Sequence, residues 1–196
     1  LRPQVPRCRY AALKMGAGCV HAGLLADNAP VVDMVQPELM LHDAQDALNL
    51  IHNQAVRPEP FDNAQDRPVE GCAPARVPTG STRTGSGNLV FVIGCGMGVS
   101  NEAYRLLYEA LKSGSPIVLD ADALNLLARH DDLRDDLRKR KAAAVLTPHP
   151  GEAARLLGCG TAEVQADRIA AAQKLAQEFA CSLVLKGADS LCVTRG

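Results

Sequence analysis

The sequence contains no tryptophan, and aromatic residues make up only 3% of its 196 residues. A core built mainly from stacked aromatic rings is therefore excluded, and aliphatic side chains must supply most of the buried surface. Hydrophobic residues account for 47% of the chain, and leucine, valine and alanine are abundant among them. A chain of this length can bury one sizeable core. Because alanine suits helices packed closely on a sheet, the composition favours one α/β domain.

An excess of either charge is also lacking. The chain carries 21 basic and 22 acidic residues, for a formal net charge of -1. Proteins that bind the nucleic-acid backbone need a concentrated basic surface. The sequence has none, so nucleic acid is excluded as an expected partner. The most charged stretch, residues 131–141, interleaves acids with bases and predicts the solvated face of a helix.

The sequence has no C-x-x-C pair and no hydrophobic run near the ~20 residues that a membrane-spanning helix requires. Its seven cysteines lie mostly among apolar residues, where a thiol behaves as a small hydrophobic group. Nothing resembles a signal peptide. We expect a soluble, cytoplasmic protein with reduced thiols and no membrane partner. Because the chain starts at Leu1 and stops at Gly196 just after a strand-like run, we also expect a fragment.

Strand-like apolar runs alternate with helical patterns along the chain. The predicted strands are residues 19–20, 88–93, 116–119, 142–146, 183–185 and 191–193, and the predicted helices include 43–51, 101–112 and 161–180. The strand runs do not alternate polar with apolar residues, which is typical of parallel strands buried on both faces. We therefore predict a mostly parallel sheet between two layers of helices.

Residues 52–87 interrupt this order. The segment is rich in Pro, Gly, Asn, Asp, Arg and Thr and shows neither hydrophobic period. It offers too little apolar surface to offset the entropy lost on ordering. We predict an inserted, disordered loop within a single domain.

Glycines and polar residues follow two of the predicted strands, at the edge where open α/β sheets bind ligands. Gly94-Cys-Gly-Met-Gly98 precedes a helix, so a ligand could approach its backbone, although a tight turn explains the glycines equally well. The spacing does not match the G-x-G-x-x-G dinucleotide motif. Asp120, Asp122 and Asn125 could bind a ligand or a hydrated cation. For Asp120 the alternative is a helix cap.

The segment Thr147-Pro-His-Pro-Gly-Glu152 is harder to explain by structure alone. Its two prolines restrict the backbone on both sides of His149 and hold that residue rigidly at a strand end. A neutral imidazole there can donate and accept hydrogen bonds. Glu152 could bind a metal-linked water or cap the backbone N–H groups of a helix. The alternative for His149 is a surface histidine in a stiffened turn.

A last polar segment, Lys186-Gly-Ala-Asp-Ser190, joins the two final predicted strands. Its lysine ends an apolar run, where an ammonium group could bind phosphate and the backbone could border a nucleotide. A hairpin turn with an exposed lysine is an equal alternative.

Taken together and in their order along the chain, the glycine loop, the polar residues 120–125, the Thr147–Glu152 segment and the 186–190 segment closely resemble the NAD(P)H-hydrate dehydratase family. The resemblance includes Asp167-Arg168 and the Ala-Ala-Arg-Leu-Leu-Gly158 that follows Glu152, and it covers most of residues 88–196. It extends upstream through residues 16–18 and 37–40 and leaves mainly 52–87 unmatched. The Thr147–Glu152 block carries the most specific match.

The resemblance implies a ribokinase-like, three-layer α/β/α fold, here incomplete. It also implies an enzyme that repairs hydrated NADH or NADPH with Mg²⁺ and ADP, or ATP in eukaryotic members. Phosphorylation turns the C6 hydroxyl into a better leaving group, and positioning and charge stabilisation supply most of the catalysis in such phosphoryl transfers.

The resemblance also assigns roles to residues. Gly96 and His149 are expected to contact the hydrated dinucleotide, and similar kinases place polar substrate contacts where Asp122 and Asn125 stand. Glu152 is expected to bind the metal through water. The expected AMP-binding residues are Lys186, Gly187, Ala188, Asp189 and Ser190.

Two departures from the family pattern stand out. Cys95 replaces a proline that stiffens the glycine loop. The glycine-rich Gly-Asp motif, whose aspartate acts as the base, is expected beyond Gly196, and the family's first glycine-rich strand and helix are expected before Leu1. We therefore predict that these 196 residues alone are inactive and contain no catalytic residue. The family also implies a homo-oligomer, and in many bacterial relatives an epimerase domain precedes this one.

Two other functions fit the same residues. A related ribokinase-like enzyme could phosphorylate a vitamin-precursor alcohol, although such kinases tend to have asparagine where His149 stands. A catalytically inactive module could instead bind nucleotides without turning them over.

Overall fold

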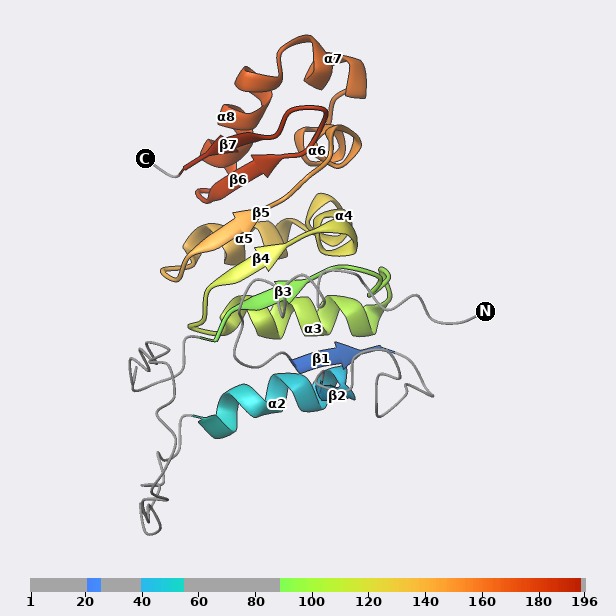
Figure 1. Ribbon diagram of the computed structural model, residues 1–196, viewed down its shortest axis with the longest axis vertical. Coiled ribbons are helices and arrows are strands. Elements are labelled where there is room, and N and C mark those ends of the chain that lie inside the picture. Colours follow the sequence, from blue (N-terminus) through green and yellow to red (C-terminus); the bar gives the residue numbers. More distant parts are fainter. Residues whose placement is uncertain (1–20, 26–39, 55–88, 195–196) are drawn as a thin grey trace, which may run out of the picture.

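The computed structural model describes residues 21–25, 40–54 and 89–194 of the chain (Figure 1). The strands are β1 (His21–Leu24), β2 (Met40–Asp43), β3 (Phe91–Ile93), β4 (Ile117–Leu119), β5 (Ala144–Leu146), β6 (Ser182–Leu185) and β7 (Leu191–Val193). The helices are α2 (Ala44–Gln54), α3 (Asn101–Lys112), α4 (Ala121–Arg129), α5 (Asp131–Lys139), α6 (Pro150–Leu157), α7 (Thr161–Ala166) and α8 (Arg168–Glu178). Within these ranges no helix is long and apolar enough to cross a bilayer.

The helices differ from the predicted ones in two places. The helix expected over 161–180 is two helices, because Asp167 leaves the helical conformation (φ -143°) and its carboxylate accepts a hydrogen bond from the Ala170 N–H, 2.9 Å away. In addition, α2 reaches Gln54. The loop prediction is therefore wrong for residues 52–54. The last turn of this helix consists of polar residues, so the sequence shows no helical spacing of apolar residues there. Residues 55–87 of that prediction, and the strand predicted at 19–20, lie outside the described residues.

Five strands form the main sheet in the order β3-β4-β5-β6-β7. Strands β3 to β6 pair in parallel, and β7 pairs antiparallel to β6. Strands β1 and β2 form a separate parallel pair, which lies with α2 beyond α3 (Figure 1). The prediction of an α/β fold with a mostly parallel sheet is confirmed.

One face of this sheet is much better buried than the other. In β4 the side chains of Ile117 and Leu119 are buried, whereas Val118 between them is only half-buried. Strand β5 shows the same alternation, and Val92 of the edge strand β3 is 55% exposed. The prediction that the 88–93 strand is buried on both faces is therefore wrong. Among the described residues, β3 has a strand on one side only and nothing buries the face that carries Val92.

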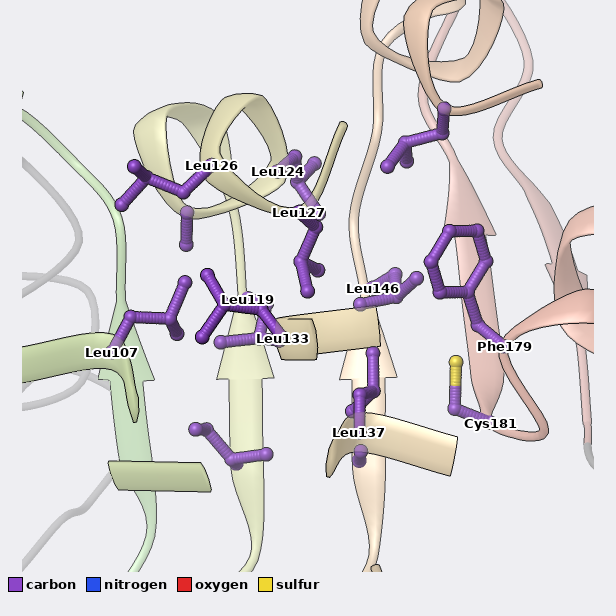
Figure 2. Packing of buried hydrophobic residues seen from close by; sticks show 14 of the residues in the cluster. Leu107, Leu119, Leu124, Leu126, Leu127, Leu133, Leu137, Leu146, Phe179 and Cys181 are labelled. Atoms are coloured by element: carbon purple, nitrogen blue, oxygen red, sulfur yellow. The ribbon is translucent and has the colours of Figure 1, made fainter. Parts of the chain in front are cut away.

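The core between helices and sheet is aliphatic, as the composition predicts. Figure 2 shows leucines of α4, α5, β4 and β5 meeting in one cluster, with Phe179 and Cys181 at its end. Phe179 is fully buried. The guanidinium groups of Arg134 and Arg138 each lie 5.9 Å from the centre of its ring, a favourable cation–π distance. This core holds strands and helices in fixed register and so fixes the loops at the sheet edge.

Candidate functional site at the carboxyl ends of the parallel strands

The four segments that the sequence singles out follow β3, β4, β5 and β6, so they lie side by side at one edge of the sheet. Backbone hydrogen bonds join them in sequence. The Asp120 N–H donates to Ile93 O (3.0 Å), and the Thr147 N–H donates to Leu119 O (3.0 Å). The Lys186 N–H then donates to Pro148 O (2.8 Å). Parallel pairing of neighbouring strands thus brings residues from 94 to 190 into one site.

The glycine loop after β3 needs glycine for two different reasons. Gly94 has φ +125°, and a Cβ atom there would lie 1.7 Å from Asp120 O, so a side chain is excluded by the neighbouring strand end. Gly96 (φ +73°) has open space where its Cβ would be. The first glycine therefore allows close packing, while the backbone of Gly96 is accessible to a ligand.

Asp122 and Asn125 tie this loop to helix α6. Asp122 Oδ2 accepts a hydrogen bond from the Gly98 N–H (2.9 Å), and Asp122 Oδ1 accepts one from Asn125 Nδ2 (3.3 Å). Asn125 Oδ1 in turn accepts from Arg155 Nη1 (2.6 Å). The two predicted polar residues are thus together and oriented. Arg155, which the sequence reasoning did not select, completes the connection.

Asp120 does not cap a helix, so that alternative is wrong. It occupies the N-cap position of α4, yet its side chain makes no capping hydrogen bond. Instead, Asp120 Oδ1 lies 2.6 Å from Lys186 Nζ, and its Oδ2 lies 3.9 Å from Cys95 Sγ. The side chains of Asp120 and Lys186 are 26% and 38% exposed. Lys186 is therefore not a freely exposed hairpin lysine but is held over the strand ends.

His149 is the N-cap of α6, and its conformation is determined by that role. Its Nδ1 accepts a hydrogen bond from the Gly151 N–H (3.0 Å), so in the neutral ring the proton is on Nε2. Glu152 Oε2 accepts from the His149 N–H (2.8 Å), which completes a capping box. The ring remains half exposed. It can therefore donate one hydrogen bond outward from a fixed position.

Glu152 caps the backbone N–H group of His149, which is one of the two roles that the sequence allows. Its side chain is 7% exposed, and its Oε1 lies 3.4 Å from His149 Nε2. Among the described residues, no group of three or more His, Cys, Asp or Glu side chains could hold a metal ion. A Mg²⁺ ion usually keeps several waters and binds one or two carboxylates together with substrate phosphates. The carboxylate of Glu152 suits a contact through water, and that role stays a prediction.

The segment between β6 and β7 is held by an arginine that the sequence reasoning gave no role. Arg168 Nη2 donates to Asp189 O (2.7 Å), Lys186 O (3.3 Å) and Leu185 O (3.4 Å). Residues 187–190 are exposed. The predicted nucleotide segment is thus an accessible loop whose carbonyl groups contact one guanidinium group.

This α/β protein, with its mostly parallel sheet and its loops at one edge, has ribokinase-like structural neighbours. A ribokinase-like superfamily protein of Enterococcus faecalis V583 has the same fold, with a TM-score of 0.53 and 17% identity over 82% of this chain and 44% of its own. So does the Bacillus subtilis ADP/ATP-dependent NAD(P)H-hydrate dehydratase, crystallised with ATP and Mg²⁺ and soaked with CoA. Its TM-score is 0.51 at 22% identity, over 82% of this chain and 46% of its own.

A model of the NAD(P)H-hydrate dehydratase family matches residues 8–196, so the chain belongs to that family. The ADP-dependent (S)-NAD(P)H-hydrate dehydratase of Neisseria meningitidis serogroup B is 47% identical over 92% of this chain and 50% of its own length. The bifunctional NAD(P)H-hydrate repair enzyme Nnr of Escherichia coli K12 is 34% identical over 92% of this chain and 28% of its own. The chain thus spans half of the first relative and less of the second.

Proposed function

We propose that this chain forms the binding region of an enzyme that dehydrates hydrated NADH or NADPH at the expense of ADP, with ATP as the alternative donor. The observation that carries the proposal is the joining of three segments at one sheet edge. The glycine loop, His149 and the 186–190 loop are linked through Asp120, Asp122 and Pro148. Family membership and the ADP-dependent Neisseria relative support the choice of reaction and donor.

The chemistry explains why such a site needs both a dinucleotide pocket and a nucleotide pocket. The hydrate carries a hydroxyl at C6 of the nicotinamide ring, and hydroxide is a poor leaving group. Transfer of the terminal phosphoryl group of ADP to that oxygen leaves AMP. The C6–O bond then breaks with help from the ring nitrogen's electron pair, phosphate departs, and loss of a proton from C5 restores the double bond. Positioning and charge stabilisation are what the protein must supply.

Each predicted residue has a place in this scheme. Gly96 presents an accessible backbone to the hydrated dinucleotide, and His149 presents a fixed Nε2–H group beside it. Asp122 and Asn125 complete that side of the site. Residues 186–190 take the AMP moiety, and Lys186 can bring a positive charge to the phosphates. Glu152 would hold Mg²⁺ through water, and the ion would shield the phosphate charge.

Further expectations belong to this proposal. The Coxiella burnetii relative is also a bifunctional repair enzyme, 36% identical over 92% of this chain, which supports a second activity in the same polypeptide. The family resemblance implies that an epimerase domain carries it. A homo-oligomeric assembly is implied by the family resemblance. The inactivity of residues 1–196 alone, and a catalytic aspartate outside them, stay predictions.

The deciding experiment incubates the full-length natural polypeptide with hydrated NADH, Mg²⁺ and ADP, with ATP in a parallel series. We expect the absorbance of the dihydronicotinamide ring to return while AMP and phosphate accumulate. Replacing Lys186 with alanine should slow this recovery at least tenfold, whereas Lys174→Ala, which changes an exposed lysine of α8, should not. Phosphorylation of an alcohol without NADH recovery would instead show a vitamin-precursor kinase. Nucleotide binding without turnover would show an inactive module.

A further inference from the structure

The loop at 186–190 is shaped by a side chain from a different element. Arg168 is the first residue of α8, and its Nη2 atom lies within hydrogen-bond distance of three loop or strand-end carbonyls, those of Leu185, Lys186 and Asp189. These carbonyls lie at both ends of the loop. One planar guanidinium group therefore determines how far apart the two ends stand.

The amide groups of the loop are left available by this arrangement. Within the described part of the chain, the N–H groups of Gly187, Ala188, Asp189 and Ser190 form no hydrogen bond to another residue. Backbone N–H groups in proteins need a partner, either water or a ligand. Since Arg168 binds the loop carbonyls, consecutive free N–H groups remain for an anion or a nucleotide base.

Gly187 packs directly on this arginine. A Cβ atom at position 187 would lie 2.4 Å from Arg168 Nη2 and 2.9 Å from its Cζ. No φ value in the left-handed region explains a glycine here, in contrast to Gly96. The glycine is therefore required by contact with Arg168.

The position of Arg168 also favours a specific role. A cation in the first turn of a helix is unfavourable, because the helix N-terminus is itself positive. Its Nε atom is buried and has no hydrogen-bond partner among the described residues. Asp167 caps the same helix and offsets part of the charge. An arginine kept in such a place is best explained by the carbonyls that its Nη2 atom binds.

We propose that Arg168 is a positioning residue that holds the 186–190 loop in the conformation that binds the adenine nucleotide. This inference rests on the proposed function and adds a residue to it. Arg168 acts through the loop and its carbonyls rather than by contact with the phosphates. Gly187 contributes by having no side chain, which leaves room for the Arg168 guanidinium group against the loop.

The test compares Arg168→Ala, Arg168→Lys and Gly187→Ala in the full-length natural polypeptide. We expect Arg168→Ala to raise the Kd for AMP and the KM for ADP about tenfold or more and to leave the KM for hydrated NADH and the thermal midpoint nearly unchanged. Arg168→Lys should recover part of the affinity, because an ammonium group can reach only some of the carbonyls. Arg129→Ala, an exposed arginine at the end of α4, is the matched control and should bind AMP normally.

The double variant distinguishes positioning from direct contact. Gly187→Ala should weaken AMP binding in the presence of Arg168, and it should add little once Arg168 is alanine, because the colliding side chain is gone. Additive effects would overturn the proposal, and so would unchanged AMP binding in Arg168→Ala. An equal rise of both KM values together with a large drop in thermal midpoint would reduce Arg168 to a structural residue.

Backbone NMR relaxation separates this proposal from the proposed function. In the ligand-free protein, Arg168→Ala should lower the order parameters of the backbone amides of residues 187–190 and leave those of β4 and β5 unchanged. If the wild type fails to recover NADH or to bind AMP, the proposed function fails, while this measurement still decides whether Arg168 orders the loop. Unchanged order parameters in the variant would overturn the positioning role.

Discussion

Single residues at the strand ends are held mainly by contacts with backbone groups and with one another. Gly94 fits against the carbonyl of Asp120, and His149 and Glu152 satisfy N–H groups at the start of α6. Such contacts leave little freedom, because each uses a group whose position the sheet already determines. The candidate site is therefore held by contacts within the chain, and a site held in this way loses less entropy when a ligand binds.

Replacing Gly94 with alanine should destabilise the protein severely. The new Cβ atom would lie 1.7 Å from Asp120 O, and the backbone has φ +125°, which L-residues rarely adopt. Steric overlap and backbone strain together should lower the free energy of unfolding by about 3 kcal/mol or more. Urea denaturation measures the change.

Gly114→Ala is the matched control, because no atom lies within 4 Å of the position that its Cβ would take. We expect that variant to be as stable as the wild type. Equal stability of the two variants would show that β3 and β4 do not approach each other as described.

At the scale of elements, buried or half-buried arginines donate hydrogen bonds to carbonyl groups at the ends of neighbouring helices. Arg140 follows α5, is 8% exposed, and donates to carbonyls at the end of α3 and just after it. Its Nη1 binds Ala110 O (3.1 Å), Leu111 O and Ser113 O (2.9 Å), and its Nη2 binds Ser115 O (2.5 Å). Burial lowers the pKa of this guanidinium. Arg134 binds the last carbonyls of α4 in the same way.

Arg140→Met should therefore remove the partners of several buried carbonyls at once. We expect a loss of about 2–4 kcal/mol in the free energy of unfolding, since each unsatisfied buried polar group costs about 1–3 kcal/mol and part of the loss is recovered by water. Lys139→Met, at the exposed neighbouring position, should change stability by less than about 0.5 kcal/mol. Chemical denaturation of both variants provides the comparison, and similar losses would contradict the capping role of Arg140.

Helices α3 and α5 are joined by a hydrogen bond whose strength depends on pH. The Tyr104 hydroxyl donates to Asp132 Oδ2. This bond lowers the pKa of the Asp132 carboxyl below its ordinary value of 3.8 and raises the pKa of Tyr104 above 10.0. The stabilisation by Asp132 is present above the ordinary carboxyl pKa and is lost as pH falls through the lowered one. The stabilisation by Tyr104 is present below pH 10.0 and is lost as pH rises through the raised pKa.

The wild type should accordingly exceed Tyr104→Phe in stability by a constant amount across the neutral range. The difference should shrink in acid, when Asp132 is protonated, and in strong alkali, when Tyr104 ionises. Denaturation midpoints measured over a pH series test this expectation. A difference that grows as the pH falls would contradict it.

At the scale of the whole molecule, apolar side chains on and beside the edge strand β3 are exposed among the described residues. Val92 is 55% exposed and Val90 is 51% exposed, and β3 pairs with β4 alone among the described residues. Unpaired apolar strand edges promote association. The chain spans half the length of the Neisseria relative. Residues 1–196 expressed alone can therefore be used to test whether the β3 edge drives association.

We expect Val92→Lys to reduce the self-association of residues 1–196 several-fold, because a charge on an edge strand opposes pairing with another chain. Ile169→Lys is the control, since Ile169 is 61% exposed but lies on helix α8 and not on β3. Sedimentation velocity gives the associated fraction. Equal effects of the two substitutions would show that net charge, rather than the β3 edge, governs association.

Much of the fold and part of the site could be predicted from local patterns. The apolar runs predict where β3 to β7 lie, because the strands of a mostly parallel sheet are rich in apolar side chains. The glycine loop, His149 and the 186–190 loop follow those runs, and parallel pairing then places them at one edge. The break at Asp167 and the exposure of Val92 were missed, because they depend on a capping side chain and on what covers a sheet face.

The sequence by itself determined which residues follow each strand, and hence the class of fold and the four segments of the candidate site. Only the tertiary structure decided which of those residues meet. Asp120 pairs with Lys186 instead of capping α4, Arg155 binds Asn125, and Arg168 holds the 186–190 loop. These contacts join residues 17 to 66 positions apart. Their geometry depends on strand order and helix packing. No local pattern in the sequence specifies either of these.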